Sequence, residues 1–229
     1  MKVSYYPGCA LHGTGKEFDL SVKAVSQALG IELKEIDDWS CCGASSTHAT
    51  NFRLSVALPA RDLMSAEKDG LTDMMVPCAA CFNRMKTTQH HLAKDDSLKR
   101  EMEAIIGGSY KGTIAVRNAI DVMHNLVGLE AIRSRVAKPL TGLKSVSYYG
   151  CLLVRPPAVC AFDDPENPVL LDGIIETMGA RNCKWSYKTD CCGGSLTISK
   201  TKYVVKLVDK LMTMAREAGA NCVVTACPV

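Results

Sequence analysis

The sequence has little that points to nucleic acid or to a lipid bilayer. Only 6% of its 229 residues are aromatic, and 27 Lys and Arg stand against 24 Asp and Glu, which leaves a net charge of +3. That small excess is not the basic footprint of a protein that binds phosphate backbones. No apolar run reaches the roughly 18 residues that a membrane span requires. We therefore expect no nucleic-acid partner and no membrane span.

Targeting and nucleotide-binding signals are also missing. The N-terminal stretch Met1–Pro7 lacks the apolar region of a secretion signal, which predicts a cytoplasmic protein. The sequence has no G-x-G-x-x-G motif after a strand and no Walker A motif. We expect no nicotinamide or flavin site in this chain, and hence little activity of the isolated chain with physiological electron donors.

Cysteine, in contrast, is abundant, with 12 residues. Disulfide frameworks belong mostly to short secreted domains, and this chain is neither short nor evidently exported. Scattered cysteines also occur as small hydrophobic residues of a core. The third possibility is metal or cluster binding, or thiol redox chemistry, and the spacing has to decide among the three.

Nine of the cysteines form two similar series. In each series a single cysteine precedes a Cys-Cys pair and another cysteine follows it. The intervening stretches have 31 and 35 residues in the first series and 39 and 34 residues in the second. The first series comprises Cys9, Cys41, Cys42, Cys78 and Cys81, and the second comprises Cys151, Cys191, Cys192 and Cys227. The first therefore ends in a Cys-x-x-Cys motif. Cys160, Cys183 and Cys222 lie outside both series, and we expect them to be core thiols.

The residues around the cysteines repeat as well, which indicates a duplication. The repeated stretches are Tyr5–Leu11 with Tyr148–Leu153, Cys41–Ser45 with Cys191–Ser195, and Asp62–Gly70 with Lys210–Gly219. Between the halves, Lys138–Gly142 has the composition of a loop. We therefore expect a first repeat over residues 1–140 and a second over residues 141–229.

Hydrophobic periodicity predicts strands and helices that alternate in both halves. Strands are expected at 2–6, 31–36, 73–76, 145–149, 185–187 and 222–225, and helices at 18–29, 47–69 with a kink or break at Pro59, from Cys78 through Met85, at 169–178 and at 196–218. This alternation is typical of an α/β fold in which helices flank a mostly parallel sheet. Each motif cysteine then follows the C-terminal end of a strand, where open α/β sheets place their ligand sites.

Several glycines accompany the cysteines and would let the backbone approach a bulky inorganic group. They are Gly8, Gly43, Gly150, Gly193 and Gly194. Amides at nearby helix N-termini could donate hydrogen bonds to sulfide or thiolate. Core cysteines would more naturally point inward from strand and helix interiors, so this placement in turns favours a binding site.

Five thiolates in one site exceed what common metal centres use. A structural zinc ion closes at four ligands, and cubane iron-sulfur clusters likewise take four cysteines. A cluster with an atypical iron arrangement, in which adjacent thiolates reach different irons, accommodates the count best. Thioredoxin-like exchange at the Cys-x-x-Cys motif remains the alternative, although it needs neither a Cys-Cys pair nor a distant fifth cysteine.

With its doubled cysteine series and its Cys-Cys-Gly motifs, the sequence resembles the cysteine-rich CCG domain family, and within it the B subunits of heterodisulfide reductases. The stretches Tyr5–Leu11, Tyr149–Pro157 and Phe162–Pro168 support the resemblance, which covers essentially the whole chain. The resemblance implies two pseudo-twofold-related repeats with a noncubane [4Fe-4S] cluster in each. It also implies that the family continues past Cys227 with a final cysteine and a helical segment, so the second repeat is expected to be C-terminally truncated.

Carried over to this sequence, the resemblance implies the first series as ligands of one cluster and the second series as ligands of the other. The implied reaction is reduction of a small disulfide, in methanogens that of coenzyme M and coenzyme B, which is split between the two clusters. Electrons would come from a ferredoxin-like iron-sulfur subunit, itself supplied by a flavin-containing subunit of the same complex. His12 and His48 lie a few residues past motif cysteines and are candidate proton donors, although a solvent-facing histidine is the common alternative.

Two other interpretations stay open. CCG domains also occur in complexes that resemble succinate, glycolate or lactate oxidation systems, where the sites would relay electrons rather than cleave a disulfide. Alternatively, one of the two sites holds a structural zinc ion and only the other performs redox chemistry.

Overall fold

The computed structural model describes residues 1–228, with all their side chains except that of Ser45. The chain divides into two compact units: the first contains Met1–Ala119 with Ala158–Cys160 and Pro228, and the second contains Ile120–Pro157 and Ala161–Cys227. Val229, the last residue of the predicted second repeat, lies outside the described residues. The boundary between the compact units therefore lies before residue 140, where we expected the two repeats to join. The division into repeats at residue 140 remains a prediction.

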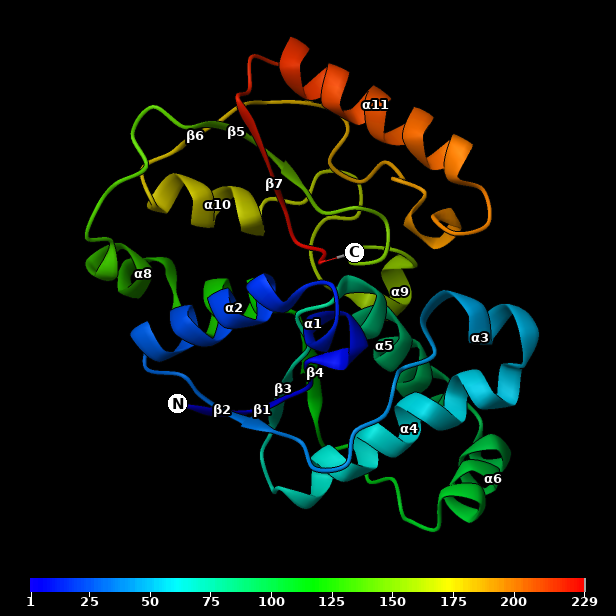
Figure 1. The fold of residues 1–229 in the computed structure, drawn as a ribbon. Coiled ribbons are helices and arrows are strands. Elements are labelled where there is room, and N and C mark those ends of the chain that lie inside the picture. The colour runs from blue at the N-terminus through cyan, green and yellow to red at the C-terminus, as the bar shows by residue number, and fades with distance from the viewer. Residues whose placement is uncertain (229) are drawn as a thin grey trace. The chain divides into compact units, whose positions relative to one another are not determined.

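The first unit is a parallel sheet with helices on both faces (Figure 1). Its four strands lie in the order β2-β1-β3-β4, and every neighbouring pair is parallel. The strands are β1 (Lys2–Tyr5), β2 (Glu32–Glu35), β3 (Asp73–Met75) and β4 (Ala115–Arg117). The helices are α1 (Gly8–His12), α2 (Lys16–Ala28), α3 (Ala44–Thr50), α4 (Phe52–Lys68), α5 (Ala79–Lys94) and α6 (Asp96–Ile106).

Burial of the two central strands explains why the sheet forms here. In β1, Val3, Ser4 and Tyr5 are fully buried, and in β3 so are Met74 and Met75. A parallel strand with helices on both faces is expected to be apolar throughout rather than alternating. The edge strand β2 is more exposed along its whole length than the two central strands.

The strand order decides where a ligand site can lie. Because parallel crossovers are right-handed, the order β2-β1-β3 places α2 and α4 on opposite faces of the sheet. The winding direction therefore reverses between β1 and β3. Open α/β sheets bind their ligands at the C-terminal strand ends beside such a reversal.

The second unit repeats this plan with three parallel strands, in the order β6-β5-β7. The strands are β5 (Lys144–Tyr148), β6 (Arg181–Asn182) and β7 (Cys222–Thr225). From Ala119 onward the helical segments are α7 (Ala119–Asp121), η1 (Val122–Val127), α8 (Leu129–Arg135), α9 (Pro157–Cys160), α10 (Leu170–Thr177), η2 (Gly194–Leu196) and α11 (Thr201–Glu217). Most of α9 belongs to the first unit. The expected α/β class, with a parallel sheet and flanking helices in each repeat, is confirmed.

Two sequence-based expectations about the first unit were wrong. The break in the helix predicted over 47–69 lies at Asn51, whose side chain caps α4 by accepting the Leu54 N–H at 3.0 Å, and Pro59 lies inside that helix. No strand was expected at β4, a short edge strand that gains its pairing only from β3. Both differences arise from contacts that periodicity does not report.

The second unit holds two more differences. Residues 185–187 are not a strand: β6 lies earlier in the chain, and the Trp185 indole N–H donates to the Ser147 carbonyl at 2.9 Å. The indole therefore packs over the central strand instead of extending an edge. The helix expected over 196–218 begins only at Thr201, after the short turn η2. Among the described residues, none of the helices is both long and apolar enough to cross a membrane.

Candidate functional site

The five cysteines of the first series converge at the C-terminal end of the first unit's sheet. Cys9 lies in α1 directly after β1, Cys78 is the N-terminal cap of α5 after β3, and Cys81 lies in the first turn of α5. The Cys9 and Cys41 Sγ atoms are 3.6 Å apart, and those of Cys42 and Cys81 are 3.2 Å apart. Residues separated by more than thirty positions thus meet past the C-terminal strand ends, where the strand pattern placed them, and the strand order puts this place at the winding reversal between β1 and β3.

The thiols of this first cysteine site differ in their exposure. Cys42, Cys78 and Cys81 are buried, whereas Cys9 and Cys41 are exposed. Hydrogen bonds from Cys41 and Cys81 lower the pKa of the Cys42 thiol. The pKa of Cys78 is lowered by its hydrogen bond with Cys81. Hydrogen bonds with Cys42 and Cys78 in turn raise the pKa of Cys81. Because the thiolate is the form that binds metals, Cys42 and Cys78 are the buried thiols prepared for that role.

Gly8 shows how closely the backbone approaches these thiols. Its φ is +70°, and a Cβ at this position would lie 3.0 Å from the Cys81 Sγ and 3.1 Å from the Tyr6 ring. Only glycine combines that backbone conformation with so little space. Gly43, Gly150 and Gly193 also have positive φ, whereas Gly194 does not.

The second cysteine site is built at the same place in its own unit. Cys151 follows β5, Cys191 and Cys192 precede η2, and Cys227 follows β7. The Gly193 N–H donates to the Cys191 Sγ at 3.3 Å, and the Gly194 N–H donates to the Cys192 Sγ at 3.4 Å. The amides at the N-terminus of η2 therefore donate to thiol sulfur, as expected of helix N-termini beside the cysteines. Cys191 is exposed and the other three thiols are half-buried, so this site is more open than the first.

A tyrosine three residues before the first cysteine supports each Cys-Cys loop. The Tyr6 hydroxyl donates to the Ser40 carbonyl at 2.7 Å, and the Tyr148 hydroxyl donates to the Asp190 carbonyl at 2.7 Å. Ser40 and Asp190 are the residues immediately before the two Cys-Cys pairs. Burial raises the pKa of both phenols, so each remains a hydrogen-bond donor.

The neighbouring tyrosines have a second shared role. The Tyr5 hydroxyl donates to Asp19 of α2 at 2.6 Å, and the Tyr149 hydroxyl donates to Asp172 of α10 at 3.2 Å. Tyr6 therefore corresponds to Tyr148, since each lies three residues before its cysteine. By hydrogen-bond role, the first tyrosine of one Tyr-Tyr pair corresponds to the second tyrosine of the other. Sequence reasoning noticed the repeated tyrosines but missed this division of roles, which spacing from Cys9 and Cys151 would have shown.

The structure places the two candidate proton donors beside the first site rather than within its thiol pairs. The His12 ring lies edge-on to Trp39 with 4.9 Å between ring centroids, and its Nε2 is 3.5 Å from Glu35. The His48 Nδ1 is 3.1 Å from the Ala44 carbonyl of its own helix. Their proton-donor role stays a prediction.

The cysteines outside the two series occupy packed positions. Cys160 is 1% exposed, and the Asn83 amide lies 3.4 Å from its Sγ. Cys183 packs with Val146 and Ala215 in the core of the second unit, and Cys222 lies in β7. Cys160 and Cys183 are buried, as core thiols are, whereas Cys222 is only half-buried.

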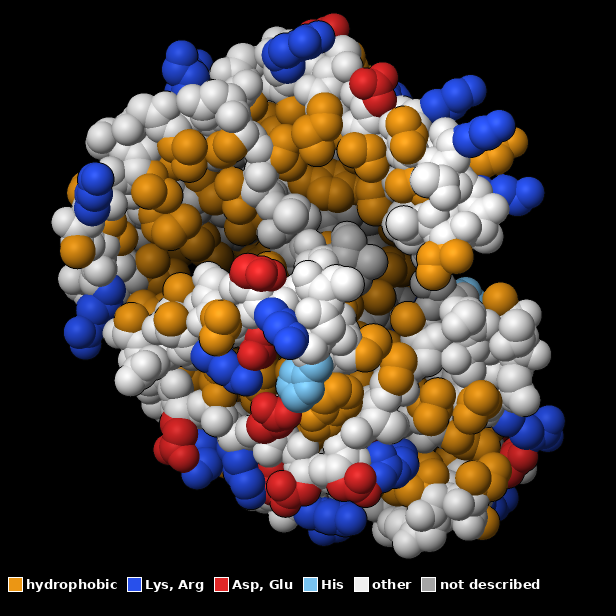
Figure 2. All heavy atoms as spheres, in the orientation of Figure 1, with side chains coloured by type: hydrophobic (Ala, Val, Ile, Leu, Met, Phe, Trp, Pro, Cys, Tyr) orange, Lys and Arg blue, Asp and Glu red, His pale blue; other side chains and the backbone are white. Residues whose placement is uncertain are grey.

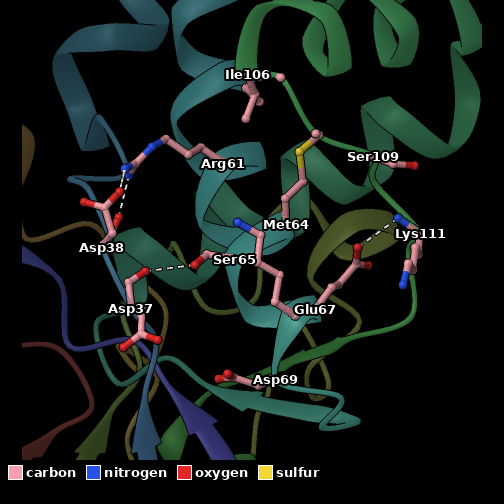
Figure 3. Close-up of a pocket in the computed structure, with 13 residues that line it drawn as sticks. Asp37, Asp38, Arg61, Met64, Ser65, Glu67, Asp69, Ile106, Ser109 and Lys111 are labelled. Atoms are coloured by element: carbon pink, nitrogen blue, oxygen red, sulfur yellow. Dashed lines mark hydrogen bonds and ion pairs between the residues drawn. The ribbon is translucent and has the colours of Figure 1, made fainter.

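A cavity of about 450 Å³ in the first unit holds no motif cysteine. Figure 3 shows that its polar groups are engaged with one another: Arg61 pairs with Asp38, and the Lys111 backbone N–H donates to Glu67 at 2.8 Å. The Ser65 hydroxyl likewise donates to the Asp37 carbonyl at 2.8 Å. The cavity is therefore separate from the cysteine chemistry.

The donor set of the cysteine sites fits an iron-sulfur group better than a single ion. Within residues 1–228, no three His, Cys, Asp or Glu side chains are arranged to hold one metal ion. The first site instead offers only thiols, in close pairs that spread over α1, α5 and the loop before α3. Iron-sulfur groups are held by cysteine thiolates on several irons, which suits this spread.

Comparison with known proteins supports this interpretation. The family described as a cysteine-rich domain, CCG, matches residues 3–86 and 146–229, one match in each repeat. The chain is 30% identical to the 8-methylmenaquinol:fumarate reductase membrane anchor subunit of Wolinella succinogenes, over 99% of this chain and 79% of that protein. It is 27% identical to the B subunit of the ferredoxin/F(420)H(2)-dependent CoB-CoM heterodisulfide reductase of Methanosarcina acetivorans, over 99% and 77%.

Two further similarities complete the comparison. A protein of Archaeoglobus profundus that is described as similar to the B subunit of heterodisulfide reductase is 28% identical, over 99% of this chain and 78% of that protein. A crystal structure of a hypothetical protein from Helicobacter pylori matches with a TM-score of 0.72 and 9% identity, over 99% of this chain and 41% of that chain. At that identity the structural match shows the fold alone.

Proposed function

The chain belongs to the cysteine-rich CCG domain family, and from that premise we propose that it is the cluster-bearing subunit of an oxidoreductase complex that reduces a small disulfide. The observation that carries the proposal is the convergence of the first cysteine series, with Sγ–Sγ distances of 3.2 and 3.6 Å. Relatives named as B subunits of heterodisulfide reductases, matched over almost the whole chain, support the choice of substrate class.

Each cysteine series is proposed to hold one noncubane [4Fe-4S] cluster. The ligands are Cys9, Cys41, Cys42, Cys78 and Cys81 in the first site, and Cys151, Cys191, Cys192 and Cys227 in the second. When bound, two such groups supply two single-electron steps, which matches the two electrons that reduction of one disulfide consumes. In that reaction the S–S bond breaks, two protons are taken up, and two thiols leave.

The protein's own residues contribute binding, charge compensation and access. The buried thiols of Cys42, Cys78 and Cys81 bind from the interior, and the amides of Gly193 and Gly194 offset negative charge on thiolate sulfur. The exposed thiols of the two sites lie where a small disulfide can approach from solvent. His12 and His48 are proposed as proton donors to the departing thiolates.

The source of the electrons is part of the proposal, since the sequence shows no nucleotide-binding motif. We propose that the direct donor is a ferredoxin-like iron-sulfur subunit of the same complex, which in turn receives electrons from a flavin-containing subunit. The disulfide of coenzyme M and coenzyme B, or a related one, is the proposed substrate. Co-purification with a small ferredoxin-like protein tests this arrangement, and a fully active monomer would argue against it.

A second candidate function is electron relay in a different complex. The specific observation in its favour is the 30% identity to a subunit named for fumarate reduction rather than for disulfide reduction. In that case the same thiols hold clusters of the same kind, but no disulfide is cleaved. A structural zinc ion at one of the sites is the third possibility.

Anaerobic purification with iron, sulfide and zinc analysis separates these functions. Two four-iron clusters require about eight irons and no zinc per complete chain, whereas one zinc with about four irons indicates the mixed case. Disulfide reduction with an artificial low-potential donor then distinguishes the first proposal from the second. A chain that carries both clusters but leaves every disulfide tested intact would favour electron relay.

A further inference from the structure

The residue immediately before the first Cys-Cys pair is held from two sides. The Ser40 backbone N–H and hydroxyl donate to the same oxygen, Oδ1 of Asp62 in α4, at 2.8 and 3.2 Å. The Ser40 carbonyl accepts the Tyr6 hydroxyl at 2.7 Å. The donors and the acceptor of Ser40 are thus engaged by a helix and by the end of the central strand.

This anchoring matters because the next two thiols point to different partners. The Cys41 Sγ lies 3.6 Å from that of Cys9, and the Cys42 Sγ lies 3.2 Å from that of Cys81. A rotation of the loop about its backbone would move both thiols away from their partners. The orientation of Ser40 therefore determines whether the two pairs can form together.

Asp62 is a charged residue at a buried helix position, where an apolar side chain would suffice for packing alone. It is 0% exposed, and its Oδ2 has no hydrogen-bond partner among the described residues. The nearest cation, Arg61, has its Nη1 3.9 Å from Oδ1 and also pairs with Asp38. Burying a carboxylate with so little compensation is unfavourable. Its structural contribution is the pair of hydrogen bonds that it accepts from Ser40.

The second unit joins the corresponding two positions by an ion pair instead of hydrogen bonds to a serine. Lys210 occupies the repeat position of Asp62, and its Nζ lies 3.3 Å from the Asp190 carboxylate. Asp190 occupies the position of Ser40, and its carbonyl accepts the Tyr148 hydroxyl. Here the side chains of the ion pair are 53% and 43% exposed, so water and salt reach both.

We propose that Asp62 and Lys210 are positioning residues that fix the loops carrying the two Cys-Cys pairs, the first through buried hydrogen bonds and the second through an exposed ion pair. This rests on the proposed function only in that the pairs are taken as cluster ligands. It follows that the first loop keeps its geometry in high salt, whereas the second loosens because mobile ions screen its ion pair.

The first test compares Asp62→Ala and Asp62→Asn in the complete chain, with Asp73→Asn as the matched control. Asp73 begins β3, at the opposite end of that strand from Cys78, and pairs with Arg117. Asp62→Ala is expected to lose the electron paramagnetic resonance signal of the first site and about half of the iron. Asp62→Asn keeps a side-chain oxygen that accepts from Ser40, so it is expected to retain both, as is the control.

A wild-type signal and iron content in Asp62→Ala would overturn the proposal. So would equal losses in Asp62→Asn and Asp62→Ala, because the hydrogen-bond acceptor would then not be what matters. If Asp62→Ala does not fold, Ser40→Ala provides the decisive variant, since it removes one of the two donors and is expected to broaden the first-site signal without abolishing it. An unaltered signal in Ser40→Ala would count against the proposal.

A second readout, amide hydrogen exchange of the metal-free chain, does not depend on clusters. Exchange at Cys41 and Cys42 is expected to accelerate at least tenfold in Asp62→Ala. In the wild type, about 1 M salt is expected to accelerate exchange at Cys191 and Cys192 but not at Cys41 and Cys42. Equal salt responses of the two loops would overturn the proposal. A wild-type protein that binds no iron but shows the expected exchange pattern would count against the proposed function alone.

Discussion

The two units of this protein build one motif in two environments. In the first unit β3 is paired on both sides and three of the five thiols are buried, whereas β7 has a pairing partner on one side only among the described residues. Figure 2 shows apolar side chains open to view over the second unit. Three apolar side chains of α11 are more than half exposed: Tyr203, Val205 and Met212. The motif therefore determines where the thiols meet, and the surrounding elements determine how far they are removed from water.

The supporting charges show the same division. The first Cys-Cys loop is held by the buried carboxylate of Asp62, and the second by the exposed pair of Lys210 and Asp190. A buried hydrogen bond is little affected by salt, whereas an exposed ion pair contributes only about 0–1 kcal/mol. A duplicated sequence has thus kept its geometry while its electrostatics diverged.

The largest effect is expected when one cysteine of each Cys-Cys pair is replaced by serine. Cys42→Ser is expected to abolish the first-site cluster signal and remove about half of the iron, because that thiol is buried at the centre of the site. Cys192→Ser is expected to remove the second signal only. Iron analysis with electronic and paramagnetic resonance spectra measures both variants. Unchanged spectra and iron content would refute the scheme of cysteine ligands.

A smaller effect is expected when each site's glycine receives a methyl group. Gly8→Ala introduces a Cβ 3.0 Å from the Cys81 Sγ, whereas Gly150→Ala meets nothing closer than the Tyr148 hydroxyl oxygen at 3.6 Å. Both variants bear the roughly 1–2 kcal/mol strain of a positive φ, so the difference between them isolates the steric clash. We expect Gly8→Ala alone to disturb its cluster spectrum. Equal stability losses in denaturant, with two unchanged spectra, would contradict this.

The free energy of unfolding should depend on pH through the ionisation of Asp62. Burial raises the pKa of its carboxyl from 3.8 to about 7. In the folded chain the carboxyl therefore stays protonated up to about pH 7, whereas in the unfolded chain it ionises near pH 4. The free energy of unfolding is highest below pH 4 and falls as the pH rises through 7. One pH unit of pKa displacement corresponds to about 1.4 kcal/mol, so the loss is expected to reach a few kcal/mol.

Asp62→Asn removes this titration and provides the control. The free energy of unfolding of the metal-free wild type, relative to Asp62→Asn, is expected to fall between about pH 4 and pH 8. Parallel pH profiles for the two proteins would show that Asp62 does not titrate in this range.

The smallest effect is expected for the exposed ion pair itself. Lys210→Gln should change the free energy of unfolding by no more than about 1 kcal/mol, and that difference should vanish in high salt. Denaturant titrations at two ionic strengths measure it. A salt-independent loss of several kcal/mol would mean that Lys210 acts through packing, for which its position over the Tyr187 ring at 4.8 Å would be the reason.

Much of the arrangement was predictable because it depends on local pattern. The alternation of apolar runs located β1, β3, β5 and β7 to within a residue or two, and the cysteines that follow them indicated a shared site. Asp62 and Ser40 were not predictable as a pair, because a polar residue on a helix is normally expected to face solvent. Trp185 was misassigned for a similar reason, since its indole bonds to a neighbouring strand that the sequence does not identify.

What the sequence by itself determined is the duplicated cysteine series, the positions of β1, β3, β5 and β7, and the family. These depend on spacing and on apolar periodicity, which are properties of the chain read in one direction. Only the tertiary structure decided which thiols pair, which groups the paired tyrosines bond to, and that one Cys-Cys loop is anchored in the interior and the other at the surface. The reason is physical: burial and hydrogen-bond partners depend on residues far apart in the chain, and folding alone brings them within reach.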